Sequence, residues 1–155
     1  MTPEPLSTPT DVRLAALRIA TAELIAAVEP DDEVMILARL NVAGSALYAL
    51  WLLLGVNGRD QVRWAGDDPA RRNVVGLVYA RGEADHRGEH VAMAAGYGEA
   101  PYGLGPYGGG WLWRECPTDR PLYRASQLLY DEQVCWCSVD GPFTRALAWF
   151  EAHQP

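Results

Sequence analysis

The sequence predicts an all-α fold, a helical bundle with a Gly/Tyr-rich loop before its C-terminal helices. Three observations predict it. Apolar residues recur at helical spacing over most of the chain, the alternation typical of strands is scarce, and 49% of the 155 residues are hydrophobic. A chain of this length is expected to form one domain. We place that domain at residues 10–155, after a disordered tail over residues 1–9.

The first helix should follow that tail, which carries proline at positions 3, 5 and 9. Thr10 is the candidate N-cap, and Pro30 ends the helix because proline cannot continue it. The apolar residues between them fall at three-, four- and seven-residue spacings, which predicts an apolar stripe. They are Leu14, Leu17, Leu24, Ile25 and Val28.

A second helix is predicted over residues 33–55, with Asp31 and Asp32 as capping residues. No charged residue occurs in residues 40–58, a length that also suggests a membrane span. The strongly apolar part covers residues 46–56, which is shorter than the roughly 20 residues that a bilayer requires. We therefore expect a buried central helix that is apolar on all sides, and no association with a membrane.

Residues 57–67 are predicted to connect this helix to a third one. Asp68 supplies a capping carboxylate, and Pro69 suits the first helical position because its missing N–H is not needed there. The helix is expected to run toward Ala95. Three glycines interrupt it, each costing about 1 kcal/mol relative to alanine, unless they permit close packing against a neighbour. They are Gly76, Gly82 and Gly88.

Residues 96–110 consist of three pentads, GYGEA, PYGLG and PYGGG, with tyrosine in the same place in each. So many glycines and prolines predict a loop. Its tyrosines would either stack on a ligand as part of a lid or cover apolar surface of the bundle. The segment lacks the lysine of a P-loop and does not join a strand to a helix, so it is not a nucleotide-binding fingerprint.

Three elements are expected after the loop. Residues 111–113 predict an apolar turn or short strand, and residues 121–130 a short helix. The last helix opens at residues 140–142, where the order Asp, Gly, Pro is typical of a helix start. The side chains expected to face inward are Leu122, Leu128 and Leu129 in the short helix and Phe143, Ala146, Leu147 and Phe150 in the last one.

The charge of the chain excludes one class of function. Twenty acidic and 13 basic residues give a net charge of −7. Broad binding of duplex nucleic acid needs clustered positive charge, so it is disfavoured, whereas a small RNA site with a few arginines is not. Three cysteines, and no secretory signal pattern at the N-terminus, predict a reduced, cytoplasmic protein.

The segment of residues 79–91, YARGEADHRGEHV, holds two of the three histidines. Arg81 and His86 form the motif R-x-x-x-x-H, and its context GLVYARGEADH resembles the signature of the HEPN superfamily of helical RNA-cleaving and toxin-like proteins. The order of elements, the segment GWLWR and the final TRALAWFE extend the resemblance. Over most of residues 11–152 the chain is similar to an actinobacterial group of HEPN-like proteins.

This resemblance implies a metal-independent endoribonuclease of a toxin or defence system that is a homodimer and uses no cofactor. Arg81 would hold a phosphate, and His86 would act as general acid or base on the ribose 2′-OH or the leaving oxygen. Copies from two subunits would share one cleft. RNA and an antitoxin or other partner protein are the expected partners. The family usually has Asn, Asp or His after the arginine, where this chain has Gly82.

Five further residues are candidates for substrate binding, because they flank the motif or supply positive charge near it. They are His90, Arg71, Arg72, Arg114 and Glu83.

A second hypothesis is a catalytically inactive HEPN-like binding module for a protein or nucleotide partner. In a straight helix Arg81 and His86 point roughly 140° apart, because five residues turn about 500°. The segment would also fit an exposed helix face with two ion pairs four residues apart. Those pairs are Arg81 with Asp85 and Glu83 with Arg87.

Two patterns typical of metal sites are weaker, and we predict no metal. HRGEH at residues 86–90 matches the H-x-x-E-H metalloprotease pattern, with His86 and His90 as zinc ligands and Glu89 as the base. Its third ligand would have to come from elsewhere, and the nominal candidates are Glu115, Glu132 and Glu151. A soft-metal cluster of cysteines is the other pattern, although buried structural cysteines are commoner. Its members would be Cys116, Cys135 and Cys137.

Overall fold

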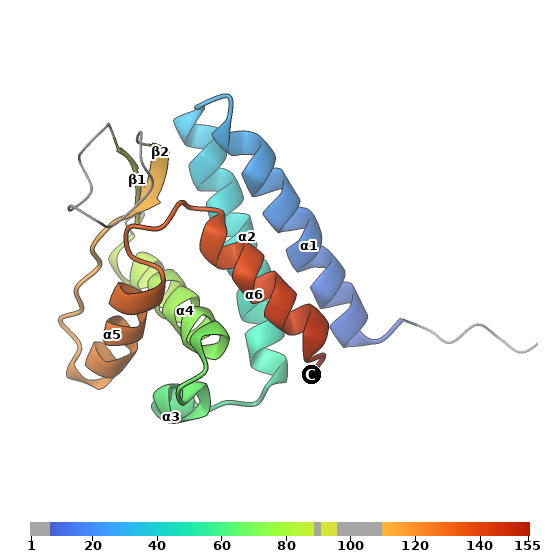
Figure 1. Cartoon of the computed structure of the whole chain (residues 1–155), viewed down its shortest axis with the longest axis vertical. Helices are drawn as coiled ribbons and strands as arrows, with labels where there is room; N and C mark the ends of the chain where they lie inside the picture. The colour runs from blue at the N-terminus through green and yellow to red at the C-terminus, as the bar shows by residue number, and fades with distance from the viewer. Residues whose placement is uncertain (1–6, 89–90, 96–109) are drawn as a thin grey trace, which may run out of the picture.

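The computed structural model describes residues 7–88, 91–95 and 110–155 (Figure 1). In these ranges six α-helices, two short 3-10 helices and a two-stranded sheet occur, so the prediction of an all-α bundle is confirmed. The α-helices are α1 Pro9–Val28, α2 Glu33–Leu53, α3 Gln61–Ala65, α4 Pro69–Arg87, α5 Arg124–Gln133 and α6 Gly141–Ala152. Most of the predicted tail and of the Gly/Tyr-rich loop, residues 1–6 and 96–109, lies outside the described residues.

Helix α1 begins earlier than predicted, because its N-cap is Thr8 and not Thr10. The Thr8 hydroxyl accepts a hydrogen bond from the Asp11 N–H at 3.1 Å, and the Asp11 carboxylate accepts one from the Thr8 N–H at 2.9 Å. This reciprocal capping box puts Pro9 at the first helical position. Thr10 lies inside the helix, where its hydroxyl donates to the Pro155 carbonyl at 3.0 Å.

Helices α1 and α2 form an antiparallel pair on one side of the molecule (Figure 1). The predicted cap of α2 is confirmed, since an Asp32 carboxylate oxygen accepts from the Met35 N–H at 3.1 Å. Asp31, the other predicted capping residue, is not the N-cap and instead joins the turn to the sheet. It takes a positive φ of 56° and accepts a hydrogen bond from the Trp111 indole at 2.8 Å, which ties the turn to the sheet.

The prediction that α2 is buried on all sides is wrong. One face packs against α1 and α4, but Val34 and Leu52 are 78% and 58% exposed. By length and composition alone this helix could cross a membrane, and a third of its most apolar window is buried in the fold. Over residues 40–53 the absence of charge that suggested burial therefore reflects a buried face and an exposed face that carries no charged residue.

The central helix is α4, in which every residue from 73 to 80 is buried. It contacts α2, α5 and α6 and lies between α5 and the α1/α2 pair (Figure 1). The predicted start is confirmed, because an Asp68 carboxylate oxygen accepts from the Ala70 N–H at 2.9 Å. Gly76 permits the close approach of α5: an added Cβ would lie 2.9 Å from Val134 Cγ2 and 3.1 Å from Tyr130 Cα.

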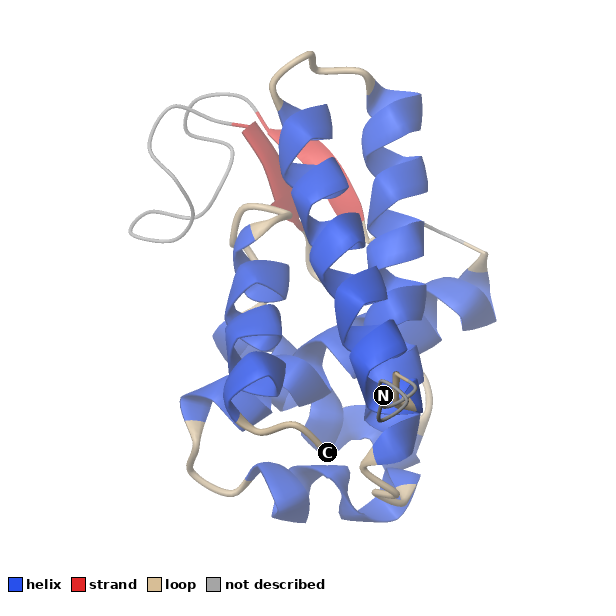
Figure 2. Cartoon of the chain, turned by 90° about the vertical axis from the view of Figure 1, so that its right-hand side faces the viewer, coloured by secondary structure: helices blue, strands red, loops and turns tan. Residues whose placement is uncertain are grey.

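Helix α4 ends at Arg87 and does not reach Ala95 as predicted. Gly88 takes a left-handed conformation, with φ 66°, and its N–H donates to the Ala84 carbonyl at 2.8 Å, which closes the helix. Strand β1, Ala92–Ala95, follows and pairs antiparallel with β2, Gly110–Trp113. The strand alternative for residues 111–113 is thus confirmed, and the small sheet lies at one end of the bundle (Figure 2).

The connection over residues 57–67 holds more structure than predicted, because it contains the 3-10 helix Gly58–Asp60 and helix α3. The short helix predicted over residues 121–130 is present as the 3-10 helix Pro121–Tyr123 followed by α5. The inward orientation predicted for Leu122 and Leu128 is wrong, because both are exposed, and it is right for Leu129. Ser126 and Tyr130 face inward with it.

The predicted stripe of α6 is confirmed. Phe143, Ala146 and Phe150 are fully buried and Leu147 is partly buried against them, so this helix closes the core over α4 and α1.

Candidate functional site

Arg81 leaves α4 on the side that faces α2. Its guanidinium carbon lies 4.2 Å from the centre of the Tyr48 ring, a cation–π contact. Its Nη2 lies 3.2 Å from Asp85 Oδ2, so the predicted pair of these residues is confirmed. The buried Nε atom has no hydrogen-bond partner. The guanidinium is therefore held by a ring and by one carboxylate that is 56% exposed.

A cavity of about 130 Å³ lies beside Arg81, and we call it the α4 pocket. Residues from α2, α3, α4 and the 3-10 helix before α5 line it: Tyr48, Gln61, Val78, Tyr79, Arg81, Gly82, Arg120 and Tyr123. Two of them are arginines and none is acidic. Each arginine also pairs with a carboxylate outside the lining, Arg81 with Asp85 and Arg120 with Glu83. The charged side chains that line the cavity are nevertheless cationic, which favours an anion over a cation as its ligand.

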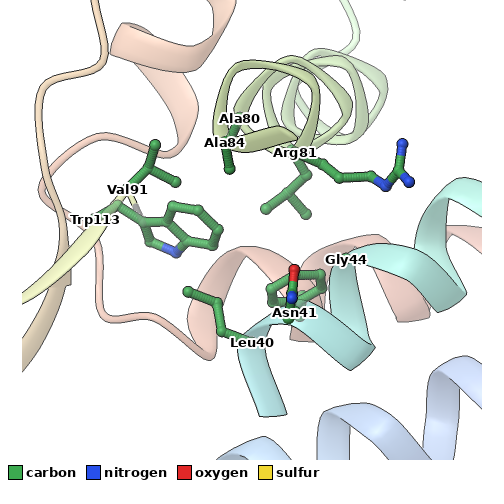
Figure 3. A pocket seen from close by; sticks show the side chains of 10 residues that line it. Leu40, Asn41, Gly44, Ala80, Arg81, Ala84, Val91 and Trp113 are labelled. Atoms are coloured by element: carbon green, nitrogen blue, oxygen red, sulfur yellow. The ribbon is translucent and has the colours of Figure 1, made fainter. Parts of the chain in front are cut away.

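A second, smaller cavity touches the other side of Arg81. It measures about 30 Å³ and is lined mainly by apolar side chains of α2, α4 and the sheet, among them Leu40, Ala84 and Trp113. The guanidinium of Arg81 points away from Trp113 (Figure 3). Since a single enclosed water needs roughly 10–15 Å³, this space suits a few waters at most. The α4 pocket is the better candidate for a ligand.

Glu83 lies on a different face of α4 and is fully buried. The exposed helix face predicted for its pair with Arg87 is therefore wrong, although the pair itself is present, with Arg87 Nε 3.4 Å from Glu83 Oε2. Glu83 Oε1 accepts from the Thr118 hydroxyl at 3.2 Å and from both Nε and Nη2 of Arg120. A carboxylate so enclosed stabilises the fold, and it has no surface to offer a substrate.

Arg120, the second arginine of the α4 pocket, was not among the predicted site residues. Its hydrogen bonds to Glu83 raise the pKa of its guanidinium above the usual value, and its guanidinium carbon lies 4.3 Å from the centre of the Tyr123 ring. Arg120 stands 37 residues from Glu83 in a segment without periodicity. No sequence signal links the two residues, so this contact could be found only in the folded chain.

His86 does not meet Arg81 within one chain. Its side chain is 47% exposed, and its Nε2 lies 3.9 Å from Asp119 Oδ1, whereas Arg81 contacts Tyr48 and Asp85. The two side chains diverge because α4 is a continuous helix over this segment, as the angle of roughly 140° requires.

The other arginines among the predicted substrate contacts have protein partners. Arg71 donates to the Trp64 carbonyl at 3.3 Å and lies over the Trp64 ring, and Arg72 pairs with Glu132 at 3.4 Å. Arg114 is partly buried, its N–H donates to the Val91 carbonyl, and its own carbonyl accepts from the Tyr130 hydroxyl. None of the three lines the α4 pocket. His90 lies outside the described residues.

The metal patterns gain no support in the described part of the chain, where no group of three or more His, Cys, Asp and Glu side chains could hold a metal ion. Burial raises the pKa of the Cys116 thiol to about 11 and that of Cys135 to about 12, which opposes the thiolate form that a metal would need. Among the nominal third ligands, Glu132 pairs with Arg72 and Glu151 with Arg18. Glu89 lies outside the described residues, as does His90.

Comparison with known proteins identifies no relative of this chain, because no family model, curated protein or solved structure matches it. The resemblance to the HEPN superfamily thus stays a prediction made from the motif. What the described residues offer chemically is a cavity lined by two arginines and three tyrosines beside α4, and the exposed imidazole of His86.

Proposed function

We propose that this chain is a binding module that holds the phosphate of a nucleotide or RNA ligand in the α4 pocket, with Arg81 as the anion-binding residue. One observation carries the proposal: Arg81 lines the pocket, its Nε is unpartnered, and its counter-ion Asp85 is exposed and weakly bound. A phosphate could replace that contact with bonds to a permanently charged, planar donor.

Binding of a 5′-phosphorylated, fluorescently labelled RNA oligonucleotide tests this function, with anisotropy as the readout. We expect Arg81→Gln to weaken binding by roughly tenfold to a hundredfold, as the loss of a hydrogen bond to a charged group does. The matched control is Arg18→Gln, because Arg18 is an exposed arginine and neither it nor its partner Glu151 lines the α4 pocket. An equal loss in both variants, or no binding by the native chain, would contradict the proposal.

A second candidate function is the metal-independent endoribonuclease that the HEPN resemblance implies. The observation that favours it is the exposure of His86, whose ring is free to meet a substrate or a second subunit, with Asp119 as its nearby carboxylate. Since Arg81 and His86 diverge on one chain, this reaction requires a homodimer that brings the two groups together across subunits. A toxin or defence setting, an antitoxin partner and a cytoplasmic location belong to this candidate.

Incubation with total RNA and tRNA, with and without EDTA, separates the two functions. Cleavage that resists EDTA and disappears in both Arg81→Ala and His86→Ala would favour the nuclease. Binding that depends on Arg81, without cleavage and without an effect of His86→Ala, is the outcome we expect. Light scattering after size exclusion measures the oligomeric state in the same samples.

A further inference from the structure

The α4 pocket has two unlike parts. We propose that Arg81 forms an anion subsite, whereas Gln61, Arg120 and Tyr123 form a second subsite that binds a planar heterocycle attached to the phosphate. This inference rests on the proposed function, since it assigns the part of the ligand that Arg81 does not bind. It names three residues outside the R-x-x-x-x-H motif that determine which phosphate ester is selected.

Arg120 and Arg81 differ in what they can offer a ligand. Nε and Nη2 of Arg120 both donate to Glu83 Oε1, so this edge of the guanidinium is occupied by a fully buried carboxylate. One face of the guanidinium lies over the Tyr123 ring, with its carbon 4.3 Å from the ring centre, so the opposite face remains for a ligand. Planar bases stack on both aromatic rings and guanidinium planes.

Gln61 adds a hydrogen-bonding group to this subsite. Its side chain lines the pocket although the residue is only 8% exposed, and its Oε1 accepts from the Ser126 hydroxyl at 3.3 Å. No hydrogen bond of the Gln61 Nε2 amide occurs among the described residues, and this atom is not one of the buried atoms without a partner. Its two N–H groups can therefore donate to a ligand, and a base edge offers such acceptors.

The size of the pocket supports a ligand larger than phosphate. Its 130 Å³ corresponds to about ten water-sized positions, if each water needs roughly 10–15 Å³. A phosphate group has five heavy atoms and would fill about half of these positions, so the pocket can admit part of a larger ligand. Gly82 keeps this space open, because a Cβ added there would meet no other atom within 4 Å. In this position a polar side chain would project into the room that we assign to the ligand.

Calorimetric titration of the full chain tests the second subsite. The probes are AMP, GMP, CMP and UMP, compared with ribose 5-phosphate and inorganic phosphate. We expect at least one nucleoside monophosphate to bind about fivefold or more tightly than ribose 5-phosphate, since this factor is the lower bound for the stacking of one base. Tyr123→Leu and Gln61→Leu should reduce this ratio toward one and leave the affinity for ribose 5-phosphate unchanged.

The matched control is Leu122→Ala, because Leu122 precedes Tyr123, is 61% exposed and does not line the pocket. Its affinities should equal those of the native chain. Circular dichroism confirms that each variant is folded, and Tyr123→Phe, which keeps the ring, should retain the native ratio. A Tyr123→Leu variant that is folded and keeps the full ratio would overturn the second subsite.

The outcomes distinguish the two proposals. If ribose 5-phosphate binds as tightly as every nucleotide and binding depends on Arg81, the heterocycle subsite is overturned and the anion subsite stands. If no probe binds, both are overturned. A 5′-phosphorylated RNA trinucleotide that binds more tightly than the monophosphates would support the subsite as a site for an RNA end, and equal affinity would support it as a site for free nucleotides.

Discussion

The face of α4 that carries Gly76 and Glu83 differs from the face that carries Gly82 and Asp85. On the first face α5 approaches the helix backbone at Gly76, and Glu83 is enclosed by two arginines and a threonine. On the second face a Cβ at Gly82 would meet nothing, and Asp85 is more than half exposed. A glycine and a carboxylate thus contribute to packing on the first face. On the second face the same two residue types leave open space and an exposed ion pair beside the α4 pocket.

The largest effect should come from the buried carboxylate. Glu83→Gln removes the charge that Arg87 and Arg120 share, and the side chains of both arginines are about two thirds buried. Removing one partner of a buried ion pair costs about 3–5 kcal/mol of stability. We expect a loss of stability near the lower end of this range, because both arginines keep some contact with water. Urea unfolding at pH 7 measures the change in the free energy of unfolding.

Asp85→Asn is the control on the opposite face of the same helix. It also removes a carboxylate from an arginine pair, but the Asp85 side chain is 56% exposed, so the expected change is about 0.5 kcal/mol or less. If the two variants lose the same stability, the two faces do not differ in the way described.

The two glycines should respond to alanine with opposite signs. At Gly76 the new methyl group would lie 2.9 Å from Val134 Cγ2, and overpacking of this kind costs about 1–3 kcal/mol. At Gly82 there is open space, so the helix propensity of alanine should add up to about 1 kcal/mol of stability. Thermal unfolding of both variants checks the signs, and a Gly76→Ala variant as stable as the native chain would contradict the close approach of α5.

A smaller effect concerns the packed face at alkaline pH. Burial raises the pKa of the Cys116 thiol to about 11, from an ordinary value of about 9. Because the folded state favours the protonated form, this contribution to stability is present below pH 9 and is lost as the pH rises toward 11. For Cys116 we expect a loss of about 1 kcal/mol between pH 7 and pH 10.

Urea unfolding of the native chain and of Cys116→Ala at several pH values isolates that contribution. The variant should lose less stability than the native chain over this range. Some dependence will remain, since burial also raises the pKa of the Tyr79 and Tyr130 hydroxyls and acts in the same direction. Identical slopes for the two proteins would show that Cys116 does not titrate in this range.

The parts of the fold that depend on neighbours in sequence could be predicted. Asp68 and Pro69 set the start of α4, Asp32 caps α2, and the stripe of α6 follows from its spacing. The start of α1 was missed by two residues because Thr8 and Thr10 offer the same chemistry, and only the reciprocal bond with Asp11 selects Thr8.

The candidate site could be predicted in part. The motif singled out Arg81, and the structure places this residue at the largest of the cavities described here. The motif could not indicate that Glu83 is buried, because four-residue spacing to Arg87 fits an exposed pair equally well. Nor could the motif identify Arg120, Tyr123 or Gln61, which lie in other segments of the chain.

By itself, then, the sequence determined the helical architecture, the termini of several helices and the segment that holds the charged residues of interest, because these depend on contacts within a few residues. The tertiary structure alone decided which face of α4 is packed and which is open, since that depends on where α2, α5 and residues 114–120 lie around it. The burial of a charge is a property of its neighbours in space, and those neighbours are assembled only when the chain folds.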